Sequence, residues 1–154
     1  MSNSQATAAD AELILKLYDL RREPVMREAR NFVAGLWPSL KTTDDLLAIT
    51  DAFGTKENAY VRQVYSYWEM VASLIAHGTL NESLAFDTMP EMYFAYALIQ
   101  PFIEEFRQKR ETPDFMKNVQ KLVESSAEGR QRVADLRRRM LAMAKRRAEA
   151  AKVA

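Results

Sequence analysis

KENAYVRQVYSYWEMVASLIAH, residues 56–77, is the segment around which the rest of the chain can be interpreted. Its apolar side chains recur three and four positions apart, which is the period of an α-helix. They are interrupted by one polar stripe, which consists of Arg62, Ser66, Glu69 and Ser73. A helix that is apolar over most of its circumference is typical of a central position in a packed structure. We therefore predict a central helix that ends at Gly78, a residue suited to the left-handed turn that closes many helices.

The same helical period recurs along the rest of the chain, and no segment shows the strict alternation of a half-buried strand. Helix-opening pairs, in which Thr or Ser precedes Asp or Glu by three residues, occur at Thr7, Thr42, Thr79, Thr88 and Ser125. We expect Pro113 to begin a helix, Pro24 to begin or kink one, Pro38 to end one and Pro101 to kink one. The sequence therefore predicts an all-α fold, a bundle of about six to eight helices with a long basic helix at its C-terminal end.

The length of the chain fits one domain, which we divide into three parts. Residues 1–8 are expected to form a disordered tail, residues 9–129 a helical core domain, and residues 130–154 a basic amphipathic helix with a frayed end. Ser125 and Gly129 mark the junction of the last two parts. The chain either begins a separate helix there or only interrupts a long one, so residues 113–150 form one helix or two.

The C-terminal segment carries a concentrated positive charge. Between Arg130 and Lys152 there are nine basic residues and two acidic ones, so this segment has a net charge of +7. The whole chain has a net charge of +1, which leaves −6 on the residues before Arg130. This asymmetry predicts that the basic helix binds an acidic surface.

An apolar seam runs along the same helix. Its apolar side chains are spaced three, four and three residues apart, which is typical of a docking helix. They are Val133, Leu136, Met140 and Met143. The positions that flank this seam are almost all arginine, and they include Arg137, Arg139 and Arg146. A parallel pair of identical helices would place these arginines against one another, and like charges at such positions reject a partner. We therefore predict an interaction surface made of these seven residues, for a partner other than a parallel copy of the helix.

The sequence lacks the residue combinations that most catalytic and metal sites need. The chain has no cysteine, which excludes disulfides, thiolate catalysis and cysteine-based metal sites. His77 is the only histidine, and we interpret it as a residue that suits the C-terminal end of its helix. We interpret Glu69 as facing water or a neighbouring helix. We predict no catalytic, cofactor-binding or metal-binding residue, and hence a protein that is not an enzyme.

No segment is expected to cross a membrane. The longest apolar run has eight residues, Met92 to Ile99, whereas a membrane-spanning helix needs about 20. The first residues, Met1 to Ala9, are small and polar and lack the apolar region of a signal peptide. Together with the absence of cysteine, these features lead us to expect a soluble, cytoplasmic protein.

A family resemblance rests on YSYWEMVASLIAHGTLNESLAFD, residues 65–87. This segment combines an aromatic helix that contains a glutamate, a glycine stop and a short capped helix that ends in an aromatic residue followed by aspartate. With LYDLRREPVMREAR upstream, at residues 17–30, it resembles a bacterial family of helical domains of unknown function. The resemblance implies an α-helical fold and supplies no catalytic residue. In similar proteins a membrane anchor can precede the domain, and we expect none in this chain.

These observations favour a non-enzymatic helical protein that acts through protein–protein contacts, as a scaffold or adaptor does. The acidic surface for its arginine-rich helix belongs to its own body, to a second subunit or to another protein, and we expect a homodimer or an acidic protein partner. One alternative is a protein that associates with nucleic acid through the C-terminal arginines, although a net charge of +1 is low for that class. A second is a small-ligand binder with an aromatic pocket between the helices at residues 60–77 and 89–109.

Overall fold

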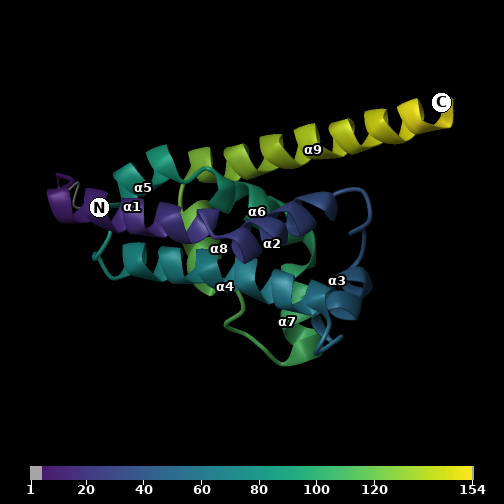
Figure 1. Ribbon diagram of the computed structural model, residues 1–154, viewed down its shortest axis with the longest axis horizontal. Helices are drawn as coiled ribbons and strands as arrows, with labels where there is room; N and C mark the ends of the chain where they lie inside the picture. Colours follow the sequence, from purple (N-terminus) through teal and green to yellow (C-terminus); the bar gives the residue numbers. More distant parts are fainter. Residues whose placement is uncertain (1–4, 154) are drawn as a thin grey trace.

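The structure, a computed structural model, describes residues 5–153, which form α-helices joined by short turns and contain no strand. The all-α class and the long C-terminal helix predicted from the sequence are therefore confirmed. The helices are α1 (Ala8–Arg22), α2 (Pro24–Gly35), α3 (Thr43–Thr50), α4 (Lys56–Ala76), α5 (Glu82–Thr88), α6 (Glu91–Ile99), the 3-10 turn η1 (Gln100–Phe102), α7 (Ile103–Arg110), α8 (Lys117–Glu124) and α9 (Ala127–Val153). Figure 1 shows α9 running along one side of the assembled shorter helices.

Several helix boundaries lie where the local chemistry of the sequence places them. The Thr7 hydroxyl accepts a hydrogen bond from the Asp10 amide, while the Asp10 carboxylate accepts one from the Thr7 amide. Thr42 and Asp45 form the same reciprocal cap at the start of α3. Pro24 occupies the first turn of α2, where its missing N–H leaves no hydrogen bond unmade. These three predictions are confirmed.

The expected caps at Thr79 and Thr88 are wrong. The N-cap of α5 is Asn81, whose side-chain oxygen accepts from the Leu84 amide at 2.9 Å. Thr79 instead belongs to the closing turn of α4, where its hydroxyl donates to the Leu74 carbonyl oxygen. Thr88 is the last residue of α5 rather than a cap for α6. The pattern of Thr followed by an acidic residue is too common to identify a cap when a better one lies nearby.

The expected helix start at Pro113 is also wrong, since α8 begins only at Lys117. Two left-handed residues enclose the intervening segment: Glu111 (φ 54°) ends α7, and Met116 (φ 55°) precedes α8. Between them the Phe115 amide donates to the Thr112 carbonyl oxygen and closes a tight turn. The kink predicted at Pro101 in the helix expected at residues 89–109 is an interruption, because the 3-10 turn η1 separates α6 from α7.

The junction near Gly129 is a true break between two helices. The side-chain oxygen of Ser126 accepts from the Gly129 amide at 3.0 Å, at the start of α9. A Cβ on Gly129 would lie 2.0 Å from the carbonyl oxygen of Val123, so α8 and α9 approach this closely only because the residue is glycine. Residues 113–150 therefore contain two helices, α8 and most of α9, rather than one.

The disordered tail predicted at residues 1–8 is wrong at its end, because Thr7 caps α1 and Ala8 is the first residue of that helix. Residues 1–4 of this tail lie outside the described residues. The predicted frayed end is helical as far as Val153, and Ala154 also lies outside the described residues.

The core is built around α4, which packs against α2, α3, α6 and α8. Trp68, Val71 and Ala72 of α4 have no exposed surface. α6 is apolar on all sides and is correspondingly buried between α4, α8 and α9. Tyr67 ties α4 to α1 by donating to the Leu17 carbonyl oxygen at 2.7 Å, and burial raises its pKa to about 12. The aromatic residues of these helices thus form the core, and their buried hydroxyl groups donate to acceptors: Tyr67 to a backbone carbonyl oxygen and Tyr96 to the Glu124 carboxylate.

Candidate functional site

The first half of α9 is anchored on the body of its own chain, across α6 and α8. Val133 is 1 % exposed, and Leu136 and Met140 are partly buried against the core. These are three of the four predicted seam residues, so the heptad spacing corresponds to a contact within the chain over this stretch. The fourth, Met143, lies further along and is only half-buried.

Arg137 fixes α9 to the end of α6. Its Nη1 donates to the carbonyl oxygens of Ala97 and Leu98, at 3.0 and 3.4 Å. In an uninterrupted helix the amide of residue 101 would bond the Ala97 carbonyl oxygen, but proline has no N–H to donate. The guanidinium thus takes the place of the missing donor. It lies 5.8 Å from the ring centres of both Trp37 and Phe102, and burial lowers the pKa of Arg137.

A second arginine of the anchored half also rests on the body. The guanidinium of Arg132 lies 4.3 Å from the ring centre of Tyr93, a residue of α6. Cations are attracted to the electron-rich face of an aromatic ring at this distance. Burial raises the pKa of the Tyr93 hydroxyl, and the positive charge of Arg132 partly opposes this rise.

Ion pairs contribute little to this contact. In residues 5–153 the ion pair made by α9 is the one between Arg138 and Asp135, both of α9 itself. Arg139 is exposed and reaches only the Asp135 carbonyl oxygen, at 3.4 Å. Asp114, an acidic residue near the end of the body, pairs with Lys117 rather than with α9. The anchored half of α9 is therefore held by apolar packing, carbonyl oxygens and aromatic rings.

The second half of α9 extends beyond this anchorage, and its yellow end projects past the other helices in Figure 1. Leu141 is 43 % exposed although it is apolar. Lys145, Arg146 and Arg147 are exposed and have no ion-pair partner among residues 5–153. Residues 141–153 contain four basic side chains and one acidic one, a net charge of +3. We refer to residues 141–153 as the distal segment.

Two grooves flank the distal segment where it passes the Trp37–Pro38 turn. One, of about 320 Å³, is lined on the α9 side by residues that include Met143 and Arg147. The other, of about 390 Å³, is lined on the α9 side by residues that include Leu141 and Lys145. Each groove therefore combines an apolar floor with at least one cation. Of the predicted surface residues, Met140, Met143 and Arg137 line these grooves, whereas Arg146 lines neither. The sequence did not indicate Trp37 and Pro38, which the fold brings to α9 from far along the chain.

The residues considered for catalysis have structural roles. His77 occupies the C-cap of α4, where its Nδ1 lies 2.8 Å from the Ser73 carbonyl oxygen. Both oxygens of Glu69 face the start of α8 and accept hydrogen bonds from the amides of Asn118 and Val119. The described residues contain no cluster of three or more His, Cys, Asp or Glu side chains that could hold a metal ion.

The aromatic pocket expected between residues 60–77 and 89–109 is replaced at Tyr65 by direct packing of α4 against α6. The hydroxyl of this fully buried residue donates to the Ala95 carbonyl oxygen of α6 at 3.1 Å. A cavity does lie beside α4, but against the turn at residues 114–116, and its geometry is described below.

The fold and this surface together define a helical domain with an appended basic helix. Residues 6–126 match the family model "Domain of unknown function (DUF4760)", and the chain belongs to this family. Searches of curated proteins and of solved structures gave no match. The matched region ends at residue 126, immediately before α9 begins at Ala127, so it comprises α1 to α8. No helix within residues 5–153 is both long enough and apolar enough to span a membrane.

Proposed function

We propose that the protein acts through protein–protein contacts, by presenting the distal segment of α9 to an acidic, amphipathic segment of a partner protein. The observation that carries this proposal is the set of cations at residues 145–147, which have no acidic partner in the described chain. Two of them, Lys145 and Arg147, line the apolar grooves. A partner with leucine-like side chains on one face and carboxylates beside them would complement both features. The expected cytoplasmic location belongs to the same proposal.

The anchorage of the first half of α9 supports the proposed role of the distal segment in binding. Residues 133–140 hold the helix on the body, so the distal segment is presented in a fixed direction. A binding element that is already ordered loses less conformational entropy when it binds. The family match ends at residue 126 and so does not include α9.

A second copy of the chain is the alternative occupant of the grooves. Pairing of two distal segments would bring two charges of +3 together, which disfavours that arrangement. Exchange of α9 between subunits would require the anchored half to leave its own body. Nucleic acid is a further alternative, but the distal segment carries no aromatic side chain for base stacking.

Fluorescence anisotropy with a labelled helical peptide of leucines and glutamates tests the proposal. We expect binding that weakens as salt is added, and a loss of about tenfold in affinity for Arg146→Glu/Arg147→Glu, roughly the effect of two rim charges. The matched control is Lys16→Glu/Lys121→Glu, which reverses two exposed lysines on α1 and α8. No binding, or an equal loss in both variants, would contradict the proposal.

Two further probes separate the alternatives. Generic duplex DNA that binds as tightly as the acidic peptide, and competes with it, would favour a nucleic-acid partner. Light scattering on the full chain without peptide reports the mass in solution. A dimer that Arg146→Glu/Arg147→Glu dissociates would identify a second copy as the occupant.

A further inference from the structure

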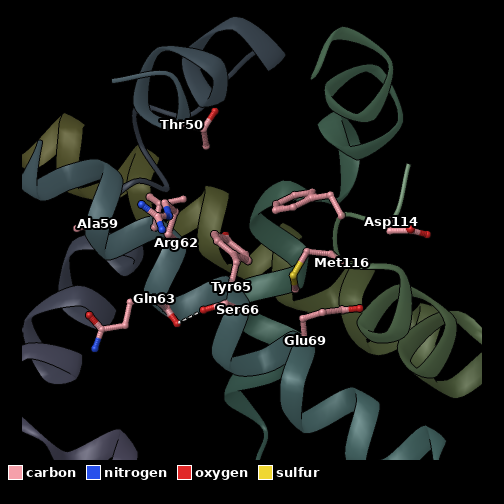
Figure 2. Close-up of a pocket in the computed structure, with 11 residues that line it drawn as sticks. Thr50, Ala59, Arg62, Gln63, Tyr65, Ser66, Glu69, Asp114 and Met116 are labelled. Atoms are coloured by element: carbon pink, nitrogen blue, oxygen red, sulfur yellow. Dashed lines mark hydrogen bonds between the residues drawn. The ribbon is translucent and has the colours of Figure 1, made fainter. Parts of the chain in front are cut away.

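A cavity of about 550 Å³ lies between α4 and the turn at residues 114–116, away from the grooves of α9. This volume is within the range of small-molecule sites, roughly 300–1,000 Å³. Figure 2 shows residues that line it: Arg62, Gln63, Tyr65, Ser66 and Glu69 come from α4, and Asp114 and Met116 come from the turn.

The floor of the cavity is apolar and rigid. Tyr65 and Met116 are each 2 % exposed, so their positions are fixed by the core. Phe115 is half-buried between two aromatic neighbours, with its ring centre 6.2 Å from that of Tyr65 and 4.7 Å from that of Phe106. Such a floor can accommodate a flat aromatic or an aliphatic group by dispersion and burial of apolar surface.

The wall formed by the turn is held in an unusual conformation. Met116 has a left-handed backbone, which costs a residue other than glycine roughly 1–2 kcal/mol. Arg107 secures the turn by donating from Nε and Nη2 to the Phe115 carbonyl oxygen, at 2.9 and 2.7 Å. Glu69 secures the following residues by capping α8. Strained backbone held in this way is frequent at binding sites, where it preorganises the wall for a ligand.

The carboxylates that line the cavity have partners within the described chain, whereas the guanidinium that lines it has none. The Asp114 carboxylate is paired with Lys117 at 2.9 Å. The Glu69 carboxylate accepts three hydrogen bonds from Asn118 and Val119, at the N-terminus of α8. Arg62 lines the cavity and has no hydrogen-bond or ion-pair partner in the described part of the chain. The charge left without a partner is therefore a cation at the rim of an apolar floor.

We infer that this cavity binds a small organic monoanion with an apolar body, such as an aromatic or short aliphatic carboxylate. The carboxylate would pair with the Arg62 guanidinium, and the apolar body would lie on Tyr65, Phe115 and Met116. Gln63 and Ser66 provide further polar atoms at the same rim. This site does not depend on the proposed function of α9, because it shares no residue with the grooves there.

Naphthoate and its neutral counterpart naphthamide are suitable probes, with binding measured by calorimetry on the full chain. We expect naphthoate to bind about fivefold more tightly than naphthamide, which corresponds to one exposed charge pair of about 1 kcal/mol. Arg62→Gln should remove this preference and leave naphthamide binding unchanged. The control Lys16→Gln, on the surface of α1, should bind both compounds as the unmodified chain does.

Two more variants make the result specific to the cavity. Ser66→Trp places a large side chain at an exposed position of the rim and should abolish binding of both compounds. Arg146→Glu/Arg147→Glu should leave binding intact, because neither arginine lines the cavity. Absence of naphthoate binding would overturn the inference, and so would binding that survives Ser66→Trp or disappears with the α9 variant.

Discussion

The guanidinium of Arg137 in α9 donates a hydrogen bond of 3.0 Å to the carbonyl oxygen of Ala97, the acceptor in α6 that Pro101 leaves without its helical donor. One break in a helix thus provides the attachment point for another helix. The same guanidinium lies against Trp37 and Phe102, so a basic residue of the tail is part of the packed body. The charge of α9 alone did not reveal that Arg137 supports the fold.

Arg137→Met should lower the free energy of unfolding by about 1–3 kcal/mol, because it leaves a buried carbonyl group without a donor. Arg138→Met is the matched control. Arg138 is exposed and pairs only with Asp135 of the same helix, so its loss should cost less than about 0.5 kcal/mol. Urea denaturation followed by circular dichroism measures both values. Equal costs would show that Arg137 does not anchor α9.

Gly129→Ala should destabilise the chain, although alanine usually favours a helix. The added Cβ would lie 2.0 Å from the Val123 carbonyl oxygen, and such overpacking costs about 1–3 kcal/mol. Gly35→Ala provides the contrast, because Gly35 has nothing within 4 Å of the added Cβ. That change should stabilise the chain by up to about 1 kcal/mol. The opposite signs are readily distinguished by thermal unfolding, and the same sign for both would contradict the close packing of α8 and α9.

Glu69→Ala should weaken α8 selectively. Its carboxylate caps the first amides of that helix, at 2.9 Å from the Asn118 nitrogen and 3.2 Å from the Val119 nitrogen. Loss of a cap typically costs about 0.5–2 kcal/mol. Hydrogen exchange should accelerate at the amides of residues 118 and 119, whereas the control Gln63→Ala, on the same helix, should leave them unchanged. Unchanged exchange in Glu69→Ala would refute the capping role.

Asp10 should give the stability of the chain a pH dependence in the acidic range. Hydrogen bonds from the Thr7 hydroxyl and amide and from the Asn81 amide lower the pKa of Asp10 below its ordinary value of 3.8. The folded state therefore favours the carboxylate, whose contribution is complete above the unfolded pKa and disappears as pH falls through the lowered folded pKa.

The corresponding experiment compares urea midpoints of the unmodified chain and Asp10→Asn as a function of pH. The variant should be less stable at neutral pH, and the difference should vanish in strong acid. Asp19→Asn, which removes an exposed carboxylate from the same helix, should remain close to the unmodified chain at neutral pH. A difference for Asp10→Asn that persists unchanged in strong acid would contradict the proposed linkage.

Local signals predicted much of the fold because they act over three or four residues. The caps at Thr7 and Thr42 and the break at Pro101 are of this kind, and the structure confirms them. The start of α8 could not be predicted in this way. It depends on the left-handed Met116, and the turn before it is held by Arg107 from another helix.

The surface of α9 was predictable only in part, because some of its contacts come from distant segments of the chain. The heptad spacing identified Leu136 and Met140, and the positions that flank the seam identified the exposed Arg139 and Arg146. The acceptors of Arg137 lie 39 and 40 residues away in the sequence, at a carbonyl position that only the path of the chain creates. The cavity at Arg62 likewise requires α4 and the turn at residues 114–116 to meet. Contacts between distant segments carry no local sequence pattern.

The central claim is that α9 is anchored by its first half and binds an acidic partner with its distal segment. Hydrogen exchange of the full chain, with and without the leucine–glutamate peptide, tests both parts together. Without peptide, we expect protected amides at residues 133–140 and fast exchange at residues 145–152, since an unsupported helical end is marginally stable in water. With peptide, residues 141–152 should become protected while α1 to α8 remain unchanged. Fast exchange along the whole of α9, or protection that appears only on α1 to α8, would contradict the claim.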